Sequence, residues 1–119
     1  MSRIINHKYT ALAIESIDMF HIDIVQEVQK TVEEKDVVVV GMFLNPYVLW
    51  VRKTLSDHNI KYTYLGYGGY FTKWKQRLAI KMWSGWPTFP QVFVKGQLIG
   101  GSKKTRQALD DGTFHQLLN

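Results

Sequence analysis

Residues 83–102, WSGWPTFPQVFVKGQLIGGS, decide the fold of this chain. Residues 91–95 and 97–99 contain the short apolar runs VFV and LI, and the Lys95-Gly96 pair between them is typical of a hairpin turn. The Gly-Gly pair that follows permits a sharp turn of the backbone, and Ser102 is the predicted N-cap of a helix through Asp110. The stretch therefore predicts a β-hairpin that leads directly into a helix.

The residues before this stretch alternate between helix and strand patterns. Apolar residues recur at three- and four-residue spacing over residues 16–34, with Ser16 as the predicted N-cap of that helix. Residues 37–43 form a short β-branched run that is typical of a strand covered on both faces. Residues 60–65 alternate with a period of two. Further helices are predicted from Asn45-Pro46 to near His58-Asn59, over about residues 71–82 and over residues 113–118.

This order of elements predicts an α/β fold. Two parallel strands joined by a crossover helix, and followed by a hairpin, form a four-stranded mixed sheet flanked by helices, and the first helix is an additional N-terminal element. Asn45-Pro46 is a strong helix start because Asn accepts bonds from the first free amides and Pro suits the first turn. The residues of that helix that we expect to be buried are Val48, Leu49, Val51 and Leu55.

The composition suits one globular domain. The chain has 119 residues, of which 45% are hydrophobic and 21% are charged, enough for a single core. We expect residues 1–14 to form an N-terminal tail and residues 15–119 to form the domain. No apolar run approaches the roughly 20 residues that span a bilayer, and MSRIINHKYT lacks the features of a secretory signal. These observations predict a cytoplasmic location without membrane association.

The chain contains no cysteine. This absence removes disulfides, thiol catalysis and thiolate metal sites together. No phosphate loop, dinucleotide fingerprint or Ser-His-Asp pattern is present. The histidines have no metal-ligand spacing, so no metal site is predicted and each is interpreted as a surface or satisfied side chain: His7, His21, His58 and His115.

Charge is unevenly distributed along the chain. The net charge is +5, yet residues 15–36 hold seven acids and two lysines, whereas residues 73–106 hold eight basic residues and no acid. A basic stripe can attract nucleic acid, an acidic protein or a small anion, or it can be an ordinary solvated helix face. Because no nucleic-acid motif accompanies it, a nucleic-acid partner is disfavoured. Tyrosines between Tyr62 and Tyr70, with Trp74, form either core or an interaction face.

The segment TFPQVFVKGQLIGG, its distance from Asn45-Pro46-Tyr47-Val48 and the Gly-Gly pair before a helix resemble the glutaredoxin family. The resemblance covers about residues 37–118, and WPTFPQ is similar to the monothiol branch. It implies the thioredoxin-like fold. Asn45, Pro46, Tyr47 and Val48 lie where dithiol glutaredoxins carry Cys-Pro-Tyr-Cys, so the catalytic positions are degenerate. Met42 lies near a position where many relatives have a lysine that supports the thiolate.

The missing thiol excludes thiol-disulfide exchange, deglutathionylation by a protein thiolate and Cys-ligated iron–sulfur clusters. We interpret Asn45 as a helix cap rather than a catalytic group, and we predict no catalytic residue. The resemblance also implies a glutathione-type groove, with Pro90 as the family's cis-proline and Phe89 beside it. The residues expected to bind a ligand there are Arg77, Trp86, Thr88, Phe89, Pro90, Gly101 and Ser102.

Three of these groove residues also have a structural interpretation. Pro90 is equally suited to a role in the fold alone, and Arg77 to a solvent-facing position in a basic helix. Trp86 fits a packing role against Pro87. By resemblance, Arg77 matches a basic residue that contacts the glycyl carboxylate, and the amides of Ser102 and Lys103 form a nest for the γ-glutamyl carboxylate.

One departure from the family pattern concerns charge. After the Gly-Gly pair, relatives usually have an acid that pairs with the γ-glutamyl ammonium, whereas this chain continues Ser102-Lys103-Lys104. A lysine there repels an ammonium group to an extent that burial and salt determine. The groove is therefore expected to favour a purely anionic ligand over zwitterionic glutathione.

Three functions follow from these observations. The first is a non-catalytic binding or adaptor module that holds a small anionic ligand, a peptide or a protein partner in the groove. No cofactor is predicted for it, although glutathione or a similar anion could bind. The second is a glutathione-dependent enzyme whose ligand supplies the thiol, oriented by Asn45, Tyr47 or Ser102. The third is a basic surface that meets nucleic acid or an acidic protein.

Overall fold

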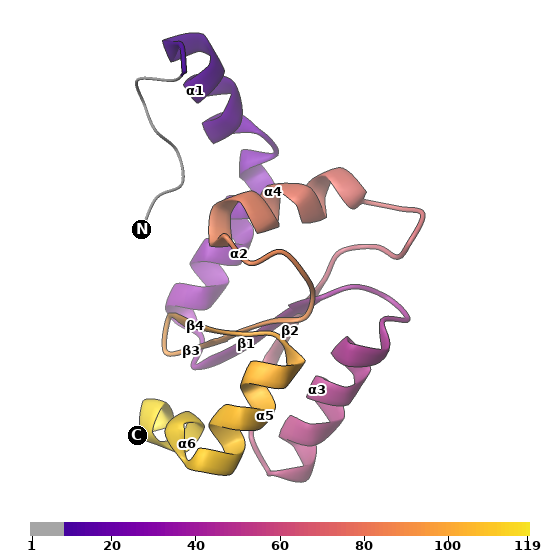
Figure 1. Ribbon diagram of the computed structural model, residues 1–119, viewed down its shortest axis with the longest axis vertical. Coiled ribbons are helices and arrows are strands. Elements are labelled where there is room, and N and C mark those ends of the chain that lie inside the picture. The colour runs from indigo at the N-terminus through magenta and orange to yellow at the C-terminus, as the bar shows by residue number, and fades with distance from the viewer. Residues whose placement is uncertain (1–8) are drawn as a thin grey trace.

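The computed structural model describes residues 9–119 and centres them on one sheet of strand order β2-β1-β3-β4 (Figure 1). β1 pairs in parallel with β2, and its other edge pairs antiparallel with β3, which forms a hairpin with β4. The predicted four-stranded mixed sheet is therefore confirmed. The strands are β1 (Val37–Gly41), β2 (Thr63–Gly66), β3 (Gln91–Val94) and β4 (Gln97–Gly100).

Helices cover both faces of this sheet (Figure 1). One face carries α2 and α4, the other carries α3, α5 and α6, and α1 extends away from the sheet at one end of the molecule. No helix among residues 9–119 is long and apolar enough to cross a membrane. The helices are α1 (Ala11–Met19), α2 (Ile22–Glu34), α3 (Pro46–Asp57), α4 (Trp74–Ser84), α5 (Ser102–Asp111) and α6 (Thr113–Leu118).

The valines of β1 hold the two layers of helices to the sheet. Successive side chains of a strand point to opposite faces, so Val38 and Val40 pack with α2 and α4, whereas Val37 and Val39 pack with α3, α5 and α6. All four valines are buried. This two-sided burial explains why the strand is continuously apolar instead of alternating.

The single helix predicted over residues 16–34 is wrong in one respect, because the chain breaks it at His21. The backbone of His21 is left-handed, with φ of 45°, and separates α1 from α2. The predicted cap Ser16 lies inside α1, whose N-cap is Thr10, with Oγ1 accepting a bond from the Ala13 amide. Residues 1–8 of the predicted tail, and His7 with them, lie outside the described residues.

The start of α5 also differs from the prediction. Gly101, not Ser102, occupies the N-cap, and no side chain caps the helix. The backbone of Gly101 is extended, and Ser102 is the first residue with helical geometry. The first amides of α5 are therefore left without a side-chain acceptor, as the termini of an uncapped helix are.

The helix that starts at Asn45-Pro46 is confirmed. Asn45 Oδ1 accepts hydrogen bonds from the amides of Tyr47 and Val48, at 2.9 and 3.1 Å. Val48, Val51 and Leu55 are buried as expected. Leu49 is not buried, since 53% of it remains exposed.

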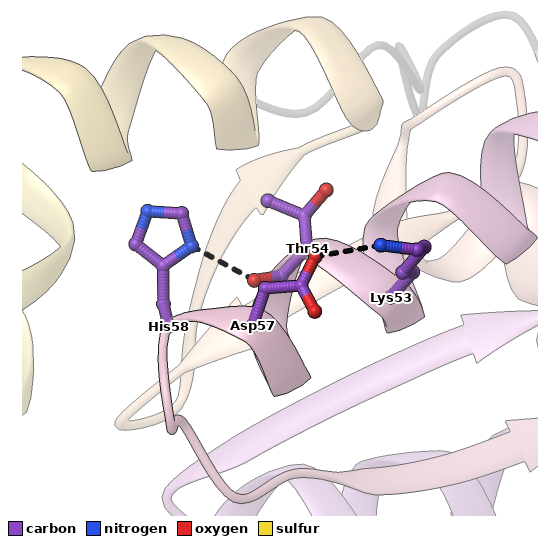
Figure 2. Close-up of polar contacts among 4 residues, drawn as sticks. All are labelled: Lys53, Thr54, Asp57 and His58. Atoms are coloured by element: carbon purple, nitrogen blue, oxygen red, sulfur yellow. Dashed lines mark hydrogen bonds and ion pairs between the residues drawn. The ribbon is translucent and has the colours of Figure 1, made fainter.

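Local polar contacts close the other end of α3 (Figure 2). Lys53 Nζ lies 2.9 Å from Asp57 Oδ2, one turn along the helix. His58 follows the last helical residue, and its Nδ1 donates to the Thr54 carbonyl oxygen at 2.8 Å. These contacts hold His58 in an exposed structural position at the helix end, in agreement with the sequence interpretation.

Candidate functional site

A groove of about 510 Å³ opens beside the first turn of α3. Its walls come from the residue that caps α3, from α4, from the segment that enters β3 and from the start of α5. Every predicted ligand-binding residue except Trp86 lines it, and so does Asn45. The lining residues are Met42, Asn45, Tyr47, Tyr70, Arg77, Lys81, Pro87, Thr88, Phe89, Pro90, Gly101 and Ser102.

The four residues at the degenerate catalytic positions lie in different surroundings. Asn45 and Tyr47 line the groove, whereas Val48 is buried in the core and Pro46 faces a neighbouring cavity. The Asn45 side-chain oxygen already accepts two helix amides, which fits its interpretation as a cap. Residues 9–119 contain no cluster of three or more metal-ligating His, Asp or Glu side chains.

Arg77 is buried, so its interpretation as a solvent-facing side chain is wrong. Only 7% of it is exposed. Its Nη1 donates to the Tyr67 carbonyl oxygen at 2.8 Å and to the Thr72 carbonyl oxygen at 2.5 Å. The guanidinium thus ties the loop between β2 and α4 to α4 while one side of it lines the groove.

The segment that enters β3 forms the opposite wall. Thr88 is exposed, while Phe89 and Pro90 are buried and joined by a cis peptide bond. Lys81 Nζ lies 5.6 Å from the centroid of the Phe89 ring, within cation–π range. Lys81 lies one helical turn after Arg77, so the i, i+4 rule could have identified it as a second basic residue of the groove.

Trp86 supports the groove from behind. Its ring lies against the Gly-Gly turn: a Cβ at Gly100 would come within 2.9 Å of Cη2 of Trp86, and one at Gly101 within 3.4 Å of its Nε1. The Nε1 atom is buried and has no hydrogen-bond partner among the described residues. Trp86 therefore packs beneath the turn that begins α5, which favours its packing interpretation.

The charge of the groove is positive. Arg77 and Lys81 are its charged lining residues, and no acid of the described part of the chain lines it. Tyr70 and Pro87 also line the groove, although the sequence did not predict them as ligand-binding residues. Near Tyr70, Phe71 and Trp74 are 98% and 57% exposed, so this part of the tyrosine-rich segment is surface, whereas Tyr67 is core.

Tyr67 fixes the loop that Arg77 holds. Its hydroxyl donates to Glu27 Oε1 of α2 at 2.5 Å. Burial, and then the Glu27 carboxylate, raise the pKa of the Tyr67 hydroxyl above its ordinary value of 10.0. The folded state therefore retains the phenol proton at a pH where the unfolded chain releases it.

We expect this pair to make stability pH-dependent on the alkaline side. The stability that the raised pKa of Tyr67 contributes is fully present below about pH 10 and is lost as the pH rises above that value. Tyr67→Phe should lower the free energy of unfolding by about 1 kcal/mol near neutral pH, because a partly buried hydrogen bond to a carboxylate is removed. It should also flatten the decline of the free energy of unfolding above about pH 10. Urea unfolding at several pH values measures both, and parallel profiles would contradict the assignment.

The known proteins that this chain resembles form one group. The family model described as Glutaredoxin matches residues 46–99. A glutaredoxin-like protein of Dictyostelium discoideum is 48% identical over 98 residues, which covers 82% of this chain and 80% of that protein. Monothiol glutaredoxin-4 of Schizosaccharomyces pombe is 30% identical over 64 residues, which covers 54% of this chain and 25% of that protein. The crystal structure of oxidized glutaredoxin 2 from Chlamydomonas reinhardtii matches with a TM-score of 0.71 and 26% identity, covering 82% of this chain and 92% of that one.

Proposed function

The chain belongs to the glutaredoxin family and has its thioredoxin-like fold, and we propose that it is a binding module without thiol-disulfide oxidoreductase activity. The observation that carries this proposal is the presence of Asn45 at the position where dithiol glutaredoxins have their first cysteine. An amide side chain occupies the start of α3, and its oxygen is engaged by two helix amides. The chain has no cysteine that could supply a thiolate from another position.

The groove beside Asn45 has the properties of a ligand-binding site, which supports a binding function. It combines a volume of about 510 Å³ with aromatic and apolar walls, as ligand sites usually do. Its charged lining residues are Arg77 and Lys81. Such a groove suits a small ligand or extended peptide that carries carboxylates, held near Thr88, Phe89 and Ser102.

Lys103 sets the charge preference of this ligand. It lies in the first turn of α5 and is exposed, next to Ser102 in the groove wall. A ligand with an ammonium group near this turn meets repulsion, whereas a carboxylate meets the lysine and the uncapped amides of α5. We therefore expect purely anionic ligands to bind more tightly than zwitterionic ones.

The test compares S-methyl glutathione with its N-acetylated form, which lacks the ammonium group. The original chain should bind the N-acetylated form about 3-fold more tightly at low salt, since an exposed charge pair contributes on the order of 0.5–1 kcal/mol. Lys103→Asp should reverse this preference. Isothermal titration calorimetry at two salt concentrations measures both affinities.

Lys75→Asp is the matched control, because Lys75 is exposed and lies outside the groove lining. It makes the same change of net charge and should leave the ratio of the two affinities unchanged. Equal ratios in Lys103→Asp and the original chain would contradict the proposed charge preference. Steady turnover of glutathione with an electrophile would instead support an enzyme whose ligand supplies the thiol, with Tyr47 as the group that orients it.

A further inference from the structure

A second cavity, of about 490 Å³, adjoins the groove between the first turns of α3 and α5. Tyr47 and Ser102 line both spaces, so the two are continuous across these residues. The wall from α3 consists of Pro46, Tyr47 and Trp50, and the wall from α5 of Ser102, Lys103 and Arg106. None of these residues except Tyr47 and Ser102 belongs to the groove described above.

The two walls have complementary chemistry. Tyr47 and Trp50 are three residues apart on α3 and therefore share one face of the helix. They are 62% and 36% exposed, so their rings are accessible from the cavity. Lys103 and Arg106 are three residues apart on α5 and present two cations opposite those rings.

Arg106 joins the two walls directly. The central carbon of its guanidinium lies 5.6 Å from the centroid of the Trp50 ring, within the range of a cation–π contact. Neither Arg106 nor Lys103 forms an ion pair with an acid of residues 9–119, and none of the acids described lines the cavity. The positive charge at this site is therefore left for a ligand to neutralise.

We propose that this cavity binds a planar aromatic carboxylate, with its ring against Trp50 and Tyr47 and its carboxylate on Arg106 and Lys103. Aromatic rings stack on each other in offset or edge geometry, and a guanidinium offers a carboxylate paired donors in one plane. An aliphatic acid would satisfy the cations alone, and a neutral aromatic molecule would satisfy the rings alone. The ligand therefore needs both features on one compact framework.

This inference does not rest on the proposed function of the groove. The two sites share Tyr47 and Ser102, and Lys103 acts on both ligands, but Trp50 and Arg106 belong to the second cavity alone. The probe also contains no peptide. The two proposals fail separately: loss of glutathione-type binding at Arg77 and Phe89 leaves the aromatic site intact, and the reverse also holds.

The experiment titrates the full chain with 2-naphthoate and follows the amide and indole signals by NMR. The expected result is a saturable shift of the Trp50 indole together with the amides of Tyr47, Lys103 and Arg106. Two probes with the same carbon skeleton separate the contributions. 2-Naphthamide removes the charge and decahydro-2-naphthoate removes the aromatic ring, and each should bind about 5- to 10-fold more weakly, since each lost interaction contributes on the order of 1 kcal/mol.

Variants of the two walls complete the test. Trp50→Leu and Arg106→Gln should each weaken 2-naphthoate binding by about 5- to 10-fold. Trp83→Leu is the aromatic control, because Trp83 is also 36% exposed but lines neither cavity. Lys75→Gln is the charge control, because Lys75 has the same 5.6 Å separation from the ring of Trp74. Both controls should bind within about 2-fold of the original chain.

Several outcomes would overturn the proposal. Equal affinities for 2-naphthoate and 2-naphthamide would show apolar adsorption without charge recognition. Equal affinities of Trp50→Leu and Trp83→Leu would remove Trp50 from the site. Shifts centred on Phe71 and Trp74 instead of Trp50 would place aromatic binding on the other exposed apolar surface.

Discussion

Gly68→Ala is expected to lower the free energy of unfolding by about 2–4 kcal/mol, through backbone strain and steric overlap together. Gly68 has a φ of +65°, and a Cβ there would lie 2.6 Å from the Thr72 carbonyl oxygen. That oxygen is a backbone atom and cannot rotate away as the end of a flexible side chain could. It also accepts the hydrogen bond from Arg77 Nη1, so its displacement loosens the buried arginine.

Gly69→Ala provides the matched control for this prediction. A Cβ at Gly69 would find its nearest neighbour, Phe43 Cβ, at 3.8 Å, which is ordinary contact, and its φ is not positive. We expect its stability to remain within about 0.5 kcal/mol of the original chain, as for most substitutions without strain or overlap. Urea unfolding compares the two variants. Similar losses in both would contradict the role assigned to the Gly68 backbone and to the Arg77 contacts.

Asn45→Cys is expected to create a reactive thiol in a chain that has none. The new sulfur would lie near the position of Asn45 Cγ, beside the amides of Tyr47 and Val48 that now donate to Asn45 Oδ1. Free amides and the helix dipole stabilise a thiolate at this place, so we expect its pKa at about 7, below the value near 8.5 of a free cysteine. The larger reductions seen in some thiol enzymes are not expected, because Met42 supplies no cation beside it. Loss of the Asn cap should reduce stability by about 1 kcal/mol.

The matched control places the thiol at the opposite end of the same helix. Ser56 is exposed in the last turn of α3, where the helix dipole disfavours negative charge, so Ser56→Cys should have a pKa at or above about 8.5. The rate of alkylation by iodoacetamide, measured against pH, gives both values. Equal pKa values in the two variants would show that the start of α3 no longer stabilises a thiolate.

Local chemistry made much of the fold predictable. The hairpin depended on a Lys-Gly turn between two short apolar runs, and the start of α3 on an Asn-Pro pair, and the structure confirms both. The break at His21 was not predictable from spacing, because Ile17, Phe20 and Ile24 continue the helical pattern across it. The extended backbone of Phe20 and the left-handed backbone of His21 interrupt the helix, and no glycine or proline marks the break in the sequence.

The family resemblance predicted where the groove lies better than it predicted the contacts that its residues make. The sequence placed Arg77 on the correct helix, yet its burial depends on the carbonyl oxygens of Tyr67 and Thr72, which an irregular loop supplies. Trp86 was expected in the groove, but its ring packs under the Gly-Gly turn. The burial of Arg77 and the packing of Trp86 both depend on contacts between segments that are far apart in the chain. No local sequence pattern predicts such contacts.

The groove is expected to bind an anionic ligand although the chain has no thiol. The most direct measurement is an amide NMR titration of the original chain with N-acetylated S-methyl glutathione at low salt. We expect saturable shifts that cluster at Arg77, Phe89 and Ser102, which line the groove. Unmoved signals at these residues, or shifts confined to exposed lysines that vanish with added salt, would contradict it.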